Sequence, residues 1–206
     1  MQRIISLITS YSARLLFRTR PTERVAALLT YADLEKLARY DGALPYHDHR
    51  VRALLWEVKY YASAPAVALA GKYLSELLLA EASDTVGVPL LIPMPMHPKR
   101  RRERGHNQTE VLCEAALKTI FSADFAYVPS VLIRTRHTKP QQGLERHNRL
   151  TNLKNSMSVS DPSQVQGRVC IVVDDVSTTG ASFAEAKRAL KAAGASEVRF
   201  VALAHS

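Results

Sequence analysis

The segment from residue 168 to residue 193 limits the choice of fold more than any other part of the sequence. Its expected strand, 168–173, is apolar after the first residue, stops at two adjacent carboxylates, Asp174 and Asp175, and continues through small residues into helical periodicity. A buried strand that leads through a loop into an amphipathic helix is the repeating unit of α/β folds. Other segments predict further strands at 89–96, 127–136, 156–159 and 198–203, and helices at about 108–121 and 180–193. The sequence therefore predicts an α/β fold with a mostly parallel sheet flanked by helices.

Residues 1–86 have a different sequence pattern from the rest of the chain. They are expected to be helical, with breaks at Pro21, 41–46 and 63–65, where proline and glycine interrupt the pattern, and they contain no convincing strand. We therefore expect an N-terminal helical region, residues 1–86, followed by an α/β domain, residues 87–206.

Cysteine usage, hydropathy and charge indicate the setting in which the protein works. Cys113 and Cys170 lie far apart in apolar stretches, so buried thiols in a reducing, cytoplasmic compartment are expected rather than a disulfide or a cysteine-based zinc site. No apolar run reaches the roughly 20 residues that a membrane span needs. Residues 1–17 are too interrupted for a signal peptide and predict a helix packed on the body, or alternatively a helix on a membrane surface. The net charge of +9 favours anionic partners such as phosphates or nucleic acid.

The loop that follows the two carboxylates has the chemistry of a phosphate cradle. In an open α/β sheet, ligands bind beyond the carboxyl ends of the strands, where the strand 168–173 would deliver both acids. The loop leads into a helix N-terminus, where unpaired backbone N–H groups and the helix dipole attract anions. Ser177, Thr178, Thr179 and Ser182 add hydroxyl donors, and Gly180 permits close approach. Because carboxylates suit sugar hydroxyls or a divalent cation, the stretch fits a ligand with a phosphate at one end and a diol at the other.

Two other interpretations of the paired acids remain open. They would lie in a solvated turn if the following Ser or Thr were an ordinary helix cap. A phosphoacceptor receiver domain also places paired acids after an apolar strand, but on its first strand, whereas only 31 residues follow Asp175 here. The common nucleotide-binding patterns GxxxxGK[ST] and GxGxxG are absent from the sequence.

Four segments carry a resemblance to a known family. The segment 171–182, "IVVDDVSTTGAS", resembles the 5-phosphoribosyl-1-pyrophosphate (PRPP) motif of type I phosphoribosyltransferases. The segment 92–112 resembles the strand, basic loop and "RG-aromatic-NQ" signature of the ComF family, with His106 at the aromatic position. The segment 134–159 resembles a second motif of that family, and 45–61 resembles its segment that ends in Lys-Tyr.

The resemblance covers roughly residues 43–206 and implies a type I phosphoribosyltransferase-like fold, with residues 1–86 as a hood over the site. Typical relatives begin with a four-cysteine zinc ribbon, which this sequence lacks; residues 1–42 look like a helical replacement, and no zinc is expected. The resemblance also implies that Mg²⁺ binds together with PRPP. The implied catalytic residues are Asp174 and Asp175, and the implied PRPP-binding residues are Asp174, Asp175, Val176, Ser177, Thr178, Thr179, Gly180, Ala181 and Ser182.

Two polar segments are candidates for binding the pyrophosphate. A basic loop, 97–105, would precede a helix capped by Asn107, and 137–155 would form a mobile lid. Either segment could instead be solvated, and the basic loop could also meet a nucleic-acid backbone. The residues assigned to the pyrophosphate and the lid are Arg100, Arg101, Arg104, Gln141, Arg146, Arg149 and Lys154.

Two functions of different classes follow from these expectations. The first is a phosphoribosyltransferase that displaces pyrophosphate from PRPP with an unknown acceptor and is linked to DNA uptake or natural transformation. The alternative is a non-catalytic protein of the DNA uptake machinery that senses PRPP or binds single-stranded DNA, a helicase or another partner protein. The two differ in whether PRPP is turned over.

Overall fold

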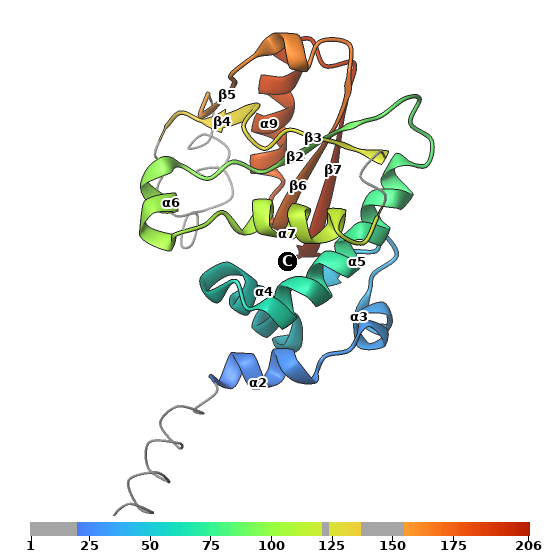
Figure 1. The fold of residues 1–206 in the computed structure, drawn as a ribbon, viewed down its shortest axis with the longest axis vertical. Helices are drawn as coiled ribbons and strands as arrows, with labels where there is room; N and C mark the ends of the chain where they lie inside the picture. Colours follow the sequence, from blue (N-terminus) through green and yellow to red (C-terminus); the bar gives the residue numbers. More distant parts are fainter. Residues whose placement is uncertain (1–19, 121–123, 137–154) are drawn as a thin grey trace, which may run out of the picture.

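The computed structural model describes residues 20–120, 124–136 and 155–206. Its main sheet has five strands in the order β1-β7-β6-β2-β3, and all neighbouring strands run parallel. These strands are β1 (Leu44–Pro45), β2 (Leu90–Pro93), β3 (Ala126–Tyr127), β6 (Val169–Ser177) and β7 (Glu197–His205). A second sheet pairs β4 (Leu132–Arg134) with β5 (Met157–Val159) in antiparallel fashion. The predicted α/β fold with a mostly parallel sheet is confirmed (Figure 1).

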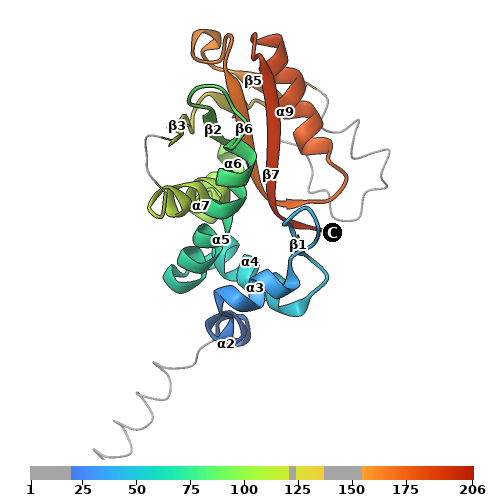
Figure 2. The same ribbon diagram turned by 90° about the vertical axis from the view of Figure 1, so that its right-hand side faces the viewer.

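The helices lie on both sides of the main sheet and beyond its carboxyl end. Their bounds are α2 (Pro21–Leu28), α3 (Tyr31–Leu37), α4 (His49–Tyr61), α5 (Ala64–Ala82), α6 (Pro98–Arg104), α7 (Gln108–Leu117) and α9 (Ala181–Ala192), with a 3₁₀ turn at Pro162–Gln164. Figure 2 shows α9 on one side of the sheet and α5 and α7 on the other, with α3 and α4 below it. None of the helices within the described ranges is long and apolar enough to cross a membrane.

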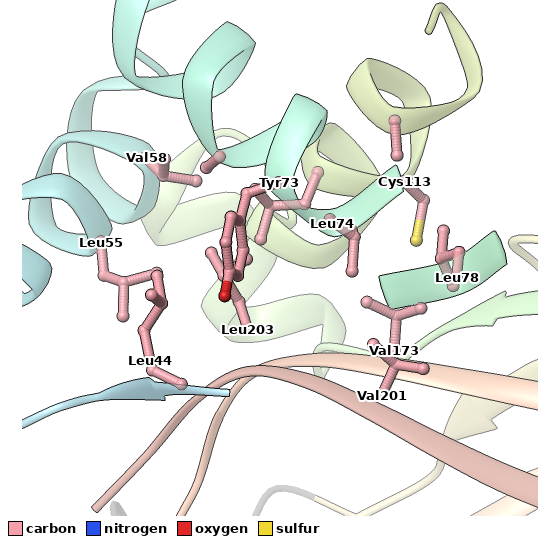
Figure 3. Close-up of a cluster of buried hydrophobic side chains, with 14 of the residues drawn as sticks. Leu44, Leu55, Val58, Tyr73, Leu74, Leu78, Cys113, Val173, Val201 and Leu203 are labelled. Carbon is pink, nitrogen blue, oxygen red and sulfur yellow. The ribbon is translucent and has the colours of Figure 1, made fainter. Parts of the chain in front are cut away.

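Successive side chains of β6 point to opposite faces of the sheet, and both faces are buried, which explains why the strand has no polar face. Ile171 and Val173 point into a core with α4, α5 and α7, whereas Cys170 and Val172 point into a second core beneath α9. A strand that is buried on both faces reads as a continuous apolar run. Figure 3 shows the first core, where Val173 of the sheet lies close to Leu78 of α5. Cys113 and Cys170 are buried free thiols, as the sequence predicted.

The expectation that the first 86 residues contain no strand is wrong. Leu44 and Pro45 pair with the end of β7, and the backbone N–H of Tyr46 donates to the carbonyl of His205 at 2.8 Å. A strand of two residues is too short to show a periodic pattern, and a proline is tolerated there because β1 lies at the sheet edge. The helix breaks at Pro21, 41–46 and 63–65 agree with the structure.

Two other predicted elements differ from the structure. The strand expected at 127–136 is two strands in different sheets, β3 and β4, separated by a turn at Pro129 and Ser130. The basic segment expected as a loop is the helix α6, which Gly105 ends with a φ of 88°. Asn107 caps α7 as predicted, its Oδ1 accepting the Thr109 N–H at 3.3 Å. The predicted N-terminal helix and the predicted lid lie outside the described residues, apart from Asn155 at the end of the lid.

Candidate functional site

The two carboxylates lie where the central strands separate. β2 pairs with β6 only as far as Pro93 and Val173, so Asp174 is the first residue of β6 beyond its neighbour. β6 itself does not stop there, as the sequence suggested, but continues to Ser177 and pairs only with β7. The chain leaves β2 toward α7 on one face and leaves β6 toward α9 on the other face. This is the switch point at which open α/β sheets bind their ligands.

The predicted cradle is the N-terminus of α9. Gly180 is the N-cap residue, with a φ of 71° that favours glycine, and no side chain caps the helix. A Cβ atom on Gly180 would meet nothing within 4 Å, so this side of the turn is open. The first backbone N–H groups of α9 therefore remain available to an anion.

Two buried polar atoms at this place have no hydrogen-bond partner among the described residues. They are Oδ2 of Asp175, whose side chain belongs to a residue only 6% exposed, and Oγ1 of Thr179. Buried polar atoms in native proteins are nearly always paired, because leaving one unpaired costs free energy. An unpaired acceptor on Asp175 and an unpaired hydroxyl in the loop that leads to an uncapped helix N-terminus are what a site for a polar ligand would contain.

A pocket of about 250 Å³ opens over these groups. All of the predicted PRPP-binding residues except Thr179 line it. The pocket is also lined by Tyr46, Lys59 and Phe183, which were not assigned to the site from the sequence. Tyr46 and Lys59 come from the segment 45–61, whose resemblance to the family was noted without a role for individual residues; that motif was the signal that could have found them.

The surroundings of the two acids shift the pKa of Asp174. Burial raises this pKa above its ordinary value, the adjacent carboxylate of Asp175 raises it further, and the positive charge of Arg134 opposes both. The backbone N–H of Asp175 donates to Oδ1 of Asp174 at 2.9 Å, which also stabilises the ionised form. Asp174 therefore keeps its proton to a higher pH than an ordinary aspartate does.

Arg134 of β4 is a further site residue, to which no role was assigned from the sequence. Burial lowers its pKa and the charge of Arg100 lowers it too, whereas Asp174 and Glu185 raise it. Arg134 of β4 therefore lies near Asp174, and Arg100 of α6 lies near Arg134. Arg134 is the first residue of the segment 134–159, whose resemblance to a family motif was noted, and that motif was the signal that could have found it.

An ion pair on α9, between the buried Glu185 and the exposed Arg188, holds β5 in place. Glu185 accepts the Met157 N–H at 3.1 Å, and Arg188 donates to the Met157 carbonyl at 2.8 Å and to Glu185 at 2.8 and 2.9 Å. Since Met157 is the partner of Arg134 in the β4–β5 ladder, this clamp also fixes the position of Arg134. The clamp thus links the helix that bears the cradle to the cation beside Asp174.

The other residues predicted to bind pyrophosphate are distributed differently. Arg100 is half-buried on α6, near Arg134, but Arg101 pairs with Glu110 at 2.7 Å and Arg104 donates to Gln108 at 2.9 Å. Gln141, Arg146, Arg149 and Lys154 lie outside the described residues. Within the described ranges, no group of three or more His, Cys, Asp and Glu side chains is arranged to hold a metal ion.

A larger hollow, of about 530 Å³, lies at the opposite end of the sheet between the segments 84–88, 167–169 and 196–199. It adjoins the amino ends of β6 and β7, away from the acids, and its Arg199 already pairs with Asp84 and Glu197. Since parallel sheets bind ligands at the carboxyl ends of their strands, we assign the site to the smaller pocket.

Comparison with known proteins shows what the chain is similar to. The model of the phosphoribosyl transferase domain matches residues 111–206. The chain is 36% identical over 132 residues to "DNA utilization protein YhgH" of Shigella flexneri, covering 61% of this chain and 56% of the relative. It is 35% identical over 137 residues to the same protein of Salmonella typhi, covering 65% and 57%. It is 31% identical over 117 residues to "Competence protein F" of Haemophilus influenzae, covering 56% and 50%.

The matched part thus spans only about half the length of these curated relatives. Among solved structures, a hypoxanthine phosphoribosyl transferase of Trypanosoma cruzi aligns with a TM-score of 0.44 at 12% identity, covering 68% of this chain and 65% of that one. The phosphoribosylpyrophosphate synthetase of Mycobacterium smegmatis aligns with a TM-score of 0.37 at 19% identity, covering 66% and 33%. The domain match and the named relatives support the resemblance to the ComF family of phosphoribosyltransferase-like proteins that the sequence motifs indicated.

Proposed function

We propose that this protein binds PRPP together with Mg²⁺ and transfers the phosphoribosyl group to an acceptor with release of pyrophosphate. The observation that carries the proposal is the pair of unpartnered buried atoms, Oδ2 of Asp175 and Oγ1 of Thr179, beside the uncapped N-terminus of α9. These groups complement the two ends of a ribose phosphate. A phosphate accepts hydrogen bonds, and ribose hydroxyls donate them.

The 5-phosphate would lie at the N-terminus of α9, where backbone N–H groups and the hydroxyls of Thr178, Thr179 and Ser182 donate to it. The carboxylates of Asp174 and Asp175 would accept from the ribose hydroxyls. This would hold the sugar in a single orientation, with its anomeric carbon toward the remaining space of the pocket.

Catalysis would consist mainly of positioning and charge neutralisation. Mg²⁺ bound with PRPP would neutralise part of the charge that develops on the departing pyrophosphate. Arg134 lies near Asp174 and Arg100 lies near Arg134, so both would add positive charge on this side of the site, and the lid residues predicted from the sequence would do the same. Lys59 and Tyr46, on the wall formed by the N-terminal region, face the same pocket and suit contact with the acceptor.

Two measurements test this function in sequence. Isothermal titration calorimetry should detect PRPP binding that strengthens when Mg²⁺ is present, and ribose 5-phosphate should compete for the same site. A pyrophosphate-release assay across nucleobases and amines should then identify an acceptor. PRPP binding without release by any acceptor would favour the sensing function, and absence of PRPP binding would refute both.

A second candidate function is the handling of single-stranded DNA. The names of the relatives refer to DNA utilization and competence, and the exposed Lys99 and Arg102 of α6 have no acidic partner within 4 Å among the described residues. With about 4 phosphates contacted at about −0.7 per contact, log K should fall with log salt at a slope of roughly −3. Replacing Arg100, Arg101 and Arg102 with Ala should flatten this slope. If the same cations also serve the pyrophosphate, PRPP with Mg²⁺ should compete with the DNA.

The cytoplasm is the compartment that we propose for both functions. The two free, buried cysteine side chains support a reducing environment.

A further inference from the structure

One face of α4 exposes large aromatic side chains. Arg52, Trp56 and Tyr60 follow one another at intervals of four residues and therefore form a stripe along the helix. Trp56 is 48% exposed and Tyr60 43% exposed, and their ring centroids are 4.3 Å apart. Exposed aromatic clusters on a protein surface usually mark a place where something binds.

The basic helix α6 extends this aromatic stripe. The guanidinium of Arg104 lies 5.0 Å from the ring centroid of Tyr60, and its hydrogen bond to Gln108 holds it there. His106, just after α6, forms a hydrogen bond with the carbonyl of Val58 at 3.2 Å, which ties the end of α6 to α4. α6 lies at the left of Figure 1, above the helical layer that contains α4. The stripe and the basic helix thus form one surface of fixed geometry.

The exposed charge of this surface is mostly positive. Arg52, Lys99, Arg101 and Arg102 are exposed on it, and the exposed acid on α6 is Glu103. Glu57 of α4 is fully buried and is neutralised by Arg20 at 2.7 Å, and Glu110 pairs with Arg101. Rings that can stack, interleaved with cations, suit a polyanion that also presents flat aromatic groups.

We propose that Arg52, Trp56, Tyr60 and Arg104 form a stacking platform for unpaired bases, and that the exposed cations of α6 hold the adjoining phosphates. Single-stranded nucleic acid is the polyanion whose bases are free to stack on aromatic side chains. A duplex offers the same phosphates, but its bases are stacked on each other. This proposal rests on the second candidate function and adds to it the residues that contact the bases and the preference for single strands.

Contact of a ligand with the platform can be followed by tryptophan fluorescence. Trp56 is the single tryptophan of the sequence, so intrinsic fluorescence reports on the platform alone. Titration with an oligothymidylate should quench this fluorescence in a saturable way. A duplex of the same length, dextran sulfate and vesicles of anionic lipid should leave it nearly unchanged, because they offer charge without accessible bases.

Variants separate stacking from charge. Trp56→Ala and Tyr60→Ala should each weaken binding of a labelled oligothymidylate on the order of 10-fold, as expected when one stacked base is lost, and should leave the salt slope unchanged. Lys99→Ala with Arg102→Ala should flatten the slope instead. Tyr40→Ala, which removes an exposed ring far from α6 in the sequence, is the matched control and should bind as the parent protein does. Circular dichroism should confirm that each variant is folded.

Each other outcome counts against a defined part of the proposal. Unchanged affinity in folded Trp56→Ala and Tyr60→Ala variants, or oligonucleotide binding without quenching, would overturn the platform and leave DNA binding by α6 intact. Equal response to duplex or to vesicles would also overturn it. No oligonucleotide binding even at low salt would refute both the platform and the second candidate function, whereas PRPP binding would be unaffected.

Discussion

At the scale of single residues, Asp174 and Asp175 are neighbours in the chain with different surroundings. Asp174 accepts a backbone N–H, and burial and the neighbouring carboxylate raise its pKa. Asp175 keeps one buried oxygen without a partner among the described residues. Crowded carboxylates are unfavourable until a cation or a hydrogen-bond donor arrives. The pair therefore gains more from a suitable ligand than an exposed pair would.

Replacing Asp175 with Ala should weaken PRPP binding by about 1–3 kcal/mol, because a buried hydrogen bond to a charged group is lost. The free energy of unfolding without ligand should not fall, since the removed oxygen has no described partner to lose. Calorimetry and urea denaturation measure the two effects. Asp124→Ala, at an exposed position, is the control. Unchanged PRPP affinity in a folded variant with both Asp174→Ala and Asp175→Ala would contradict the site.

The raised pKa of Asp174 predicts how stability depends on pH. The unfolded state loses the Asp174 proton near a pKa of about 3.9, whereas the folded state keeps it to higher pH. The folded state thus binds more protons between these two values, so the free energy of unfolding should fall as pH rises through this window. Asp174→Asn should remove this part of the dependence. Urea denaturation from acidic to neutral pH checks this; identical pH profiles of the variant and the parent protein would refute it.

At the scale of elements, α9 has two roles. Its N-terminus forms the predicted cradle, and one turn later Glu185 and Arg188 grip both backbone groups of Met157 in β5. β5 in turn sets the register of Arg134. The helix therefore couples the position of the cradle to that of the small β4–β5 sheet.

Glu185→Ala should lower the free energy of unfolding by about 1–3 kcal/mol, because the buried N–H of Met157 loses its acceptor. It should also weaken PRPP binding, since Arg134 is no longer held beside Asp174. Lys187→Ala, exposed on the same helix, should change neither quantity. A double-mutant cycle with Arg188→Ala measures the coupling, and additive effects of the two changes would show that the clamp does not act as a unit.

At the scale of the whole molecule, segments that are far apart in the sequence form the core and the pocket together. The larger core combines side chains of α4 and α5, from the N-terminal region, with α7 and the main sheet. Tyr46 and Lys59 of that region also line the pocket. The predicted boundary between residues 86 and 87 thus stays a prediction that rests on a change in sequence pattern. Because the two parts share a core, the boundary can be tested by asking whether they fold independently.

A fragment of residues 87–206 should fail to fold, because Ile171, Val173 and Leu203 would lose the cover of α4 and α5. The full chain should unfold in one transition followed alike by Trp56 fluorescence and by circular dichroism. Two separate transitions, or a fragment with native-like amide exchange protection, would instead support independent domains.

The purified protein should contain no stoichiometric zinc. The sequence lacks the ribbon cysteines of typical relatives, and both of its cysteines are buried in the cores. Elemental analysis after dialysis without chelator tests this, and one tightly held zinc per chain would contradict it. Added Mg²⁺ should change the melting temperature only when PRPP is present.

The parts of the fold and site that could be predicted are those encoded in contiguous residues. The run 168–193 specified a buried strand, paired acids and a helix N-terminus, and the structure contains all three. The two-residue strand at Leu44, the position of Lys59 and the approach of Arg134 to Asp174 depend on tertiary pairing. No local pattern encodes such contacts; the resemblance of 45–61 and of 134–159 to family motifs pointed toward Lys59 and Arg134 without giving either residue a role.

The pairing of β1 with β7 has a consequence for the time at which the pocket forms. Leu44 lies opposite Ala204, so this edge of the sheet closes only when a very early and a very late part of the chain meet (Figure 2). Contacts between residues so distant in sequence form slowly, because a long loop must close first. During synthesis, Tyr46 emerges from the ribosome long before its partner His205 exists. The nascent chain is therefore unable to assemble the pocket wall until β7 has been made, so ligand cannot assist the folding of the earlier segments.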